Sequence, residues 1–197
     1  MTGTERDLIG YALGLSEPGD ALALHDRLLD DPARSLSVAG AATLAGLPSP
    51  GPQVRAPSLG AEPGQTLGPA EHPVPGDRMV LRVTPPVSAE RLRLALFQKV
   101  DGNEILLFPR PGRPWPGLEV FRAEGPERLV DLVLEPPPGL HCYTLVLLPA
   151  ELFREPWPAD DPRWVHVREA ARRGDLPSAS AEIEVASAAG TASENAS

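Results

Sequence analysis

Proline is the feature that most limits how this chain can fold. The 197 residues include 25 prolines and 18 glycines. A proline has no backbone N–H and a fixed φ, so helix interiors and central strands exclude it. The prolines gather between stretches with hydrophobic periodicity, and they are densest at 48–76. The folded elements are therefore expected to be short, and the globular part smaller than the chain length suggests.

The first 47 residues have the periodicity of short amphipathic helices. Apolar residues recur there at spacings of three and four, which predicts helices rather than strands. Pro18 and Pro32 suit the first turn of a helix, and Asp31 suits an N-cap. The expected helices lie at 5–15, 18–29 and 32–47. Three helices of this length bury little surface, so we expect a small, marginally stable unit that a bound partner stabilises.

From residue 77 the hydrophobic period changes to two, which is typical of strands. Leu92, Leu94 and Leu96 would share one buried face, and Asp101-Gly102 supplies the positive φ angles of a tight turn. The expected strands lie at 78–83, 91–99, 105–108, 118–122, 129–134 and 141–148. Short strands separated by proline and glycine favour an antiparallel β-sandwich.

The sequence therefore predicts an α+β protein built in several parts. We expect a helical domain at 1–47, a Pro/Gly-rich linker that does not pack at 48–76, an antiparallel β-sandwich at 77–156, a short helical extension at 157–175 and a disordered tail at 176–197.

Composition limits the partners of the chain. The net charge is −9 and Lys99 is the one lysine, which argues against direct binding to nucleic acid. Without a signal-peptide pattern or an apolar window of about 18 residues, we expect a cytoplasmic protein with no membrane span. The single cysteine, Cys142, excludes an internal disulfide and fits a reducing compartment.

Two short patterns near the N-terminus carry a resemblance. YALGL at 11–15 and LLDDPAR at 28–34 resemble the anti-sigma domain with which bacteria hold extracytoplasmic-function sigma factors. In the zinc-containing version, one histidine and two cysteines bind the metal where helices two and three meet. Arg27, Asp31 and Arg34 stand at those positions here, so the resemblance is to the zinc-free version. We therefore expect no metal and no other cofactor.

The resemblance implies how the helical domain would act. In the family, this domain lies between the two DNA-binding regions of a sigma factor and blocks polymerase engagement. Residues 1–47 hold seven acidic and three basic side chains, which would complement a basic sigma surface. Carried over to this chain, the face that contacts the partner would comprise Leu8, Tyr11, Leu15, Leu22 and Leu29, edged by Asp7, Asp26 and Asp30. The expected function is that of a cytosolic regulator.

A second resemblance concerns the sandwich. LRLALFQKVDGNEILLFP at 92–109 resembles an uncharacterised bacterial β-sandwich domain with an apolar strand, a D-G turn and an L-[FY]-P ending. Members of that family are often attached to protein kinases or caspase-like peptidases. This implies an alternative function, in which the sandwich docks to a kinase or peptidase and the N-terminal helices serve as an adaptor.

Residues suited to catalysis are few, and we expect no enzyme. His141 and Cys142 are neighbours on one predicted strand, so their side chains should point to opposite faces and cannot act as a base–nucleophile pair. Phosphate-loop, dinucleotide-binding and nucleophile-elbow motifs do not occur. Two features stay open. His25 beside Asp26 is either a surface pair or a metal ligand, and the basic loop at 110–115 is either a binding loop or a turn with Trp115 folded back.

Overall fold

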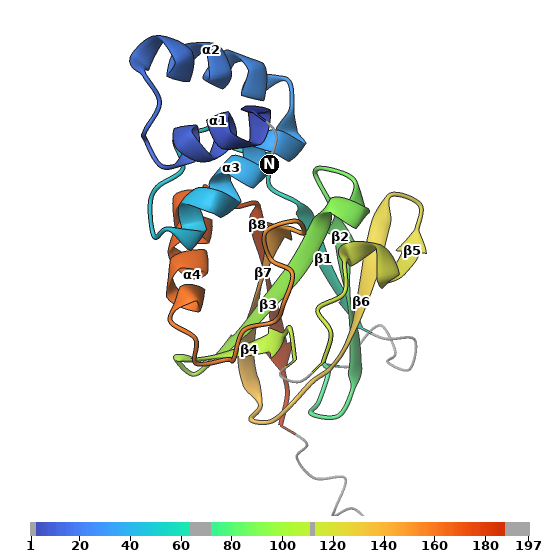
Figure 1. Ribbon diagram of the computed structural model, residues 1–197. Helices are drawn as coiled ribbons and strands as arrows, with labels where there is room; N and C mark the ends of the chain where they lie inside the picture. The colour runs from blue at the N-terminus through green and yellow to red at the C-terminus, as the bar shows by residue number, and fades with distance from the viewer. Residues whose placement is uncertain (1–2, 64–71, 111–112, 188–197) are drawn as a thin grey trace, which may run out of the picture.

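The computed structural model describes residues 3–63, 72–110 and 113–187. Within these ranges, four α-helices and two four-stranded antiparallel sheets make up an α+β fold, which confirms the predicted fold class (Figure 1). The sheets form a sandwich with a shared core. The three N-terminal helices cover one end of the sandwich, and the fourth helix lies along one side (Figure 1). In the described part of the chain, no helix is long and apolar enough to cross a membrane.

Each sheet joins strands that are distant in sequence. The first sheet has the order β1-β2-β6-β5 and the second has the order β4-β3-β7-β8. The first is built from β1 (Ser58–Pro63), β2 (Arg78–Thr84), β5 (Arg122–Glu124) and β6 (Glu127–Val133). The second is built from β3 (Leu92–Val100), β4 (Asn103–Phe108), β7 (Gly139–Pro149) and β8 (Ser178–Val185). Short 3-10 turns, η1 (Ala89–Arg91) and η2 (Leu118–Val120), precede β3 and β5.

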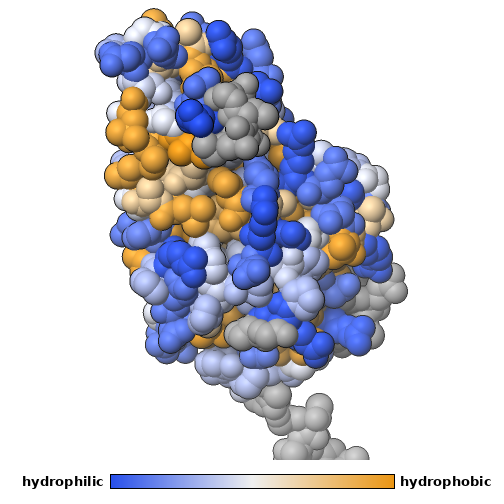
Figure 2. Space-filling model, in the orientation of Figure 1, coloured by the Kyte–Doolittle hydropathy of each residue, from blue (hydrophilic) through white to orange (hydrophobic). Residues whose placement is uncertain are grey.

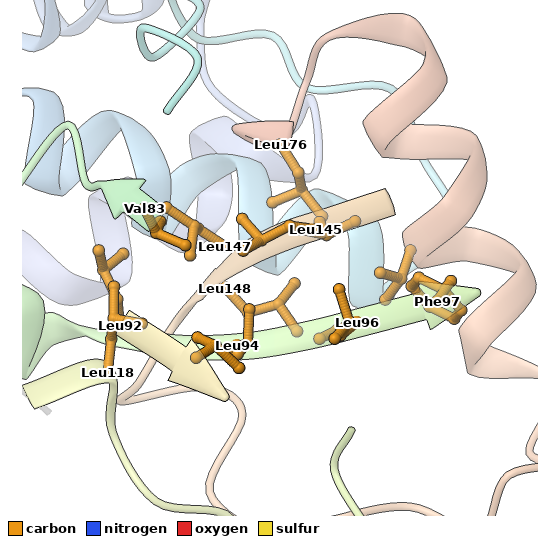
Figure 3. Close-up of a cluster of buried hydrophobic side chains, with 14 of the residues drawn as sticks. Val83, Leu92, Leu94, Leu96, Phe97, Leu118, Leu145, Leu147, Leu148 and Leu176 are labelled. Atoms are coloured by element: carbon orange, nitrogen blue, oxygen red, sulfur yellow. The ribbon is translucent and has the colours of Figure 1, made fainter. Parts of the chain in front are cut away.

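The core between the sheets is made mainly of leucine and valine. Leu92, Leu94 and Leu96 of β3 are almost fully buried, as the period-two pattern predicts. They lie beside leucines of the neighbouring strand β7 (Figure 3). Leu96, for example, is opposite Leu145 in the β3–β7 pair. Val83 of the first sheet belongs to the same core.

The outer face of the second sheet is covered by aromatic side chains and by α4 (Arg163–Arg173). Phe97 of β3 meets Trp164 of α4 edge to face at 5.9 Å. Trp115 is 3% exposed, and its Nε1 donates to the Leu94 carbonyl at 2.8 Å. Trp115 is therefore folded back into the core. The aromatic cluster comprises Phe97, Trp115, Phe153, Trp157 and Trp164.

The three predicted N-terminal helices are present. They are α1 (Gly3–Ala12), α2 (Pro18–Leu29) and α3 (Pro32–Leu44). Asp31 caps α3 as predicted, because its Oδ1 accepts from the Arg34 backbone N–H at 3.1 Å. The first and third helices end a turn earlier than expected, at Ala12 and Leu44.

Helix α3 belongs to two cores at once. Leu36 and Ala39 pack into the core of the sandwich. Val38, on another face of the helix, packs with Tyr11 and Leu28 in a second, small core. Gly40 allows a close approach, since a Cβ there would lie 2.4 Å from Pro149 Cγ at the end of β7. The helical unit is therefore joined to the sandwich by direct packing.

The prediction that residues 48–76 do not pack is wrong for the described part of that segment. Ser58–Pro63 is strand β1 and pairs antiparallel with β2. Val54 is buried in the main core. The polar and proline-rich sequence gives little indication of this strand, because only Leu59 and Ala61 mark its inner face. Residues 64–71 lie outside the described residues.

The prediction of a disordered tail at 176–197 is wrong for its first half. Ser178–Val185 is strand β8, which pairs with β7 along its length. Residues 188–197 lie outside the described part of the chain. The predicted strand at 118–122 is instead the 3-10 turn η2 followed by the short β5. The predicted helical extension contains α4.

Candidate functional site

The eight residues predicted to contact a partner do not lie on one surface. The structure divides them among the small helical core, a groove between α1 and α2, an outward stripe of α2 and a second groove beside the sandwich. Each place has a different chemistry.

Tyr11 is internal. Its side chain is 5% exposed and lies in the small core with Ala12, Leu28 and Val38. Its hydroxyl donates to the Pro50 carbonyl at 2.7 Å and lies 2.9 Å from His25 Nδ1. Since the single phenolic hydrogen is directed to Pro50, His25 Nδ1 carries a hydrogen and donates to Tyr11. Burial raises the pKa of Tyr11. Tyr11 thus pins the segment after α3 to α1, and in this structure it is not part of an exposed face.

A groove of about 480 Å³ runs between α1 and α2. Asp7 and Leu15, both predicted contact residues, line it. Its charged lining consists of Arg6, Asp7, Glu17, Asp20 and Arg27, so acidic groups outnumber basic ones. Leu15 is 76% exposed and supplies an apolar side chain at the edge of this polar groove.

Leu22 and Leu29 form an uncovered stripe on α2. They are 66% and 61% exposed, although α2 buries Leu28 fully. Leu22 follows Asp20 by two positions, and Leu29 follows Arg27 by two positions. Asp20 and Arg27 line the groove, and two positions correspond to a rotation of about 200° around the helix axis. The stripe therefore faces away from the groove. We call Leu22, Leu29 and the exposed Asp26 between them the α2 stripe.

Leu8 lies on yet another side. It lines a groove of about 380 Å³ where α1, α3 and the loop after β7 meet, together with Ile9, Val38 and Leu152. Figure 2 shows hydrophobic side chains gathered in a band where the helices meet the sandwich. Leu8 is half-buried and also packs on the small core, so its first role is internal.

Arg27, Asp31 and Arg34, the three residues that the resemblance places at the zinc-binding positions, make other contacts here. Asp31 caps α3 and pairs with Arg34, with 3.2 Å between Oδ2 and Nε. Arg27 lines the α1–α2 groove. Within residues 3–63, 72–110 and 113–187, no group of three or more His, Cys, Asp or Glu side chains is placed to hold a metal ion.

His141 belongs to a buried polar cluster between the sheets. Its Nε2 lies 2.8 Å from the Pro137 carbonyl, which can only accept, so Nε2 carries a hydrogen. Its Nδ1 lies 2.9 Å from Gln98 Nε2, and Gln98 also reaches the Tyr143 hydroxyl. Burial, then the negative charge of Glu135, raises the pKa of Tyr143 to about 12. Cys142, the next residue on the strand, points to the other face.

The first sheet carries an ion-pair cluster that sequence reasoning missed. Arg82 of β2 contacts Glu62 of β1 at 2.8 Å and Glu127 of β6 at 3.0 Å. It also contacts Glu124 of β5 at 2.5 Å. These carboxylates raise the pKa of Arg82. The residues are far apart in sequence, so only the strand order reveals the cluster.

No family model matches the chain, and no curated protein matches it.

Proposed function

We propose that this chain is a non-enzymatic regulatory protein whose N-terminal helices bind an extracytoplasmic-function sigma factor. The observation that carries the proposal is the α2 stripe, in which two leucines seven residues apart are left uncovered. Apolar residues seven positions apart lie on the same side of a helix, and such a side can pack against a helix of a partner protein. The resemblance of YALGL and LLDDPAR to the zinc-free anti-sigma domain supports the choice of partner.

Charge supports the same partner. Asp26 is exposed within the stripe, and Asp30 is exposed at the end of α2. Asp7 and Asp20 line the groove on the other side of the helix. The acidic groups within and beside the stripe, Asp26 and Asp30, favour a partner with lysine or arginine beside its apolar residues, because complementary charges speed association and disfavour wrong partners.

The test uses the full chain, because α3 is shared with the sandwich. Purified sigma factors of this class from the source genome are titrated against the wild type, and binding is measured by calorimetry. Leu22→Glu with Leu29→Glu is expected to abolish binding, since an unpaired carboxylate buried in an interface is heavily penalised. Both leucines are exposed, so the variant should fold.

Leu140→Glu is the matched control. Leu140 lies on the sandwich and is 54% exposed, so the control makes one substitution of the same type at a similar exposure. This variant should bind like the wild type. Full binding by the folded α2 double variant would show that the stripe is not the contact face. Failure of every sigma factor to bind the wild type would reject the proposal and leave docking of the sandwich to a kinase or peptidase as the function to test.

A further inference from the structure

We propose that a small pocket between α4 and the outer face of the second sheet binds the phosphate group of a phosphomonoester. The pocket has a volume of about 200 Å³. Ligand pockets for larger organic molecules have volumes of roughly 300–1,000 Å³, so this one suits a small polar group. It lies on the sandwich and is separate from the α2 stripe.

The polar lining comes from two sides of the pocket. Arg168 and Arg172 are four residues apart on α4, so they share one side of that helix. Thr144 of β7 and Ser180 of β8 are directly opposite each other in the sheet, and Ser178 lies two pairs further along, opposite Val146. Phe97 and Val146 supply apolar floor between the hydroxyls and the helix. Donors therefore face one another across the pocket, which fits a tetrahedral oxyanion better than a flat carboxylate.

Several of these donors have unused capacity. Thr144 Oγ1 and Ser180 Oγ are 3.0 Å apart, so one hydroxyl donates to the other and the second hydrogen is left for a ligand. Arg168 donates to Glu104 through one nitrogen only, Nη1. Arg172 makes no ion pair with the residues that the structure describes.

Local charge favours an anion. Two arginines and one glutamate line the pocket, leaving one net positive charge in a chain whose net charge is −9. The carboxyl end of α4 is nearby and carries partial negative charge, which opposes an anion. Binding must therefore depend on the arginine side chains, and Arg172, which lacks a carboxylate partner among the described residues, is the decisive one.

The experiment titrates inorganic phosphate, O-phosphoserine and serine against the full chain at low salt, with amide NMR shifts and calorimetry as readouts. Phosphate and O-phosphoserine should bind at one saturable site that shifts the amides of Thr144 and Ser180, and serine should not bind. Arg172→Gln should weaken phosphate binding about tenfold or more, because a charge-assisted hydrogen bond is lost. Stronger binding of O-phosphoserine than of inorganic phosphate would identify an ester as the ligand.

Arg173→Gln is the control with the same change in net charge. Arg173 pairs with Asp175 at 2.8 Å and does not line the pocket. It should leave phosphate affinity unchanged. Equal loss of affinity in the two variants would show non-specific attraction and overturn the proposal. Absence of saturable phosphate binding by the wild type would overturn it as well.

Discussion

The packing of α3 on the sandwich makes Gly40→Ala an informative substitution. A Cβ at this position would lie 2.4 Å from Pro149 Cγ, 3.1 Å from Pro149 Cδ and 3.2 Å from Leu152 Cδ1. Non-bonded carbon atoms prefer separations of about 3.5–4.0 Å. The proline ring is tied to the backbone of β7, so it cannot turn away as a long side chain would. The added methyl group therefore forces α3 and β7 apart.

Two opposing effects set the size of the change. Replacing glycine by alanine within a helix stabilises it by about 1 kcal/mol. Overpacking a well-packed core costs about 1–3 kcal/mol. The net effect on the free energy of unfolding is expected to range from near zero to a loss of about 2 kcal/mol. The sign of this net change does not separate the packing cost from the helix preference, so a second glycine-to-alanine variant is needed as a reference.

Gly10→Ala supplies that reference. Gly10 is in α1, and a Cβ there would meet only Ser16 Oγ, at an ordinary contact distance of 3.8 Å. This variant should be stabilised by up to about 1 kcal/mol. The difference between the two variants then removes most of the helix preference and leaves about 1–3 kcal/mol for the contact with Pro149.

Urea unfolding followed by tryptophan fluorescence and by circular dichroism measures both variants. The three tryptophans lie in the main core, so their fluorescence reports on the sandwich. Gly40→Ala should lower the unfolding midpoint relative to Gly10→Ala by both probes. Equal stabilisation in the two variants would refute the close approach of α3 to β7 and the shared core that depends on it.

Three further predictions concern the sandwich and its ionisable groups. Leu96→Ala should cost about 2–5 kcal/mol in urea unfolding because the side chain is fully buried, and a change near zero would place Leu96 outside the core. Burial raises the pKa of Tyr143 to about 12. The stability that the protonated Tyr143 side chain contributes is therefore complete below pH 10 and should be lost as the pH rises toward 12. Phenolate absorbance measured against pH checks this, and titration of Tyr143 near pH 10 would contradict its burial. The hydrogen bonds from Arg163 lower the pKa of Asp161 to about 2. The stability that the ionised Asp161 contributes is therefore present above pH 4 and lost as the pH falls toward 2. NMR titration should show a higher pKa of Asp161 in Arg163→Gln, and an unchanged value would contradict the pairing.

The N-terminal helices were predictable because their signals are local. Pro18 and Pro32 each start a helix, and Asp31 accepts the capping hydrogen bond that its position suggests. The central strands were predictable for a similar reason. Leu92, Leu94 and Leu96 alternate without interruption, and Asp101-Gly102 closes the hairpin with two positive φ angles.

Strands β1 and β8, each at one edge of its sheet, were missed because composition masks their period. β8 places Ala179, Ala181, Ile183 and Val185 on its inner face, and two of these are alanine. Serine and glutamate fill the alternate positions, which is the composition expected of a disordered tail. β1 is similar, with a glycine at 60 and a proline at 63. Such strands form because a long neighbour, β2 or β7, offers them a ready ladder of hydrogen bonds, and this cannot be read from local sequence.

Helical spacing identified apolar residues at the candidate site but not their partners. Tyr11 and Leu15 are four residues apart and were expected on one face. Tyr11 is buried and Leu15 is exposed, because α1 ends at Ala12 and the chain then turns. The bond from Tyr11 to Pro50 depends on the chain after α3 folding back, across 39 positions. The division of the leucines into inward and outward sets is therefore a tertiary property.

The shared position of α3 also decides how the proposed function can be tested. A fragment that ends at residue 50 would expose Leu36 and Ala39, which the sandwich core covers in the full chain. That fragment would offer a partner an apolar surface which the intact protein does not have, so its binding would be no evidence for the α2 stripe. Conversely, a partner held on α2 is linked through Leu28 and Val38 to a helix that packs against β7. Binding of such a partner should therefore also raise the stability of the sandwich, as measured by tryptophan fluorescence during unfolding. Unchanged unfolding of the sandwich would mean that α3 does not couple the helical unit to it.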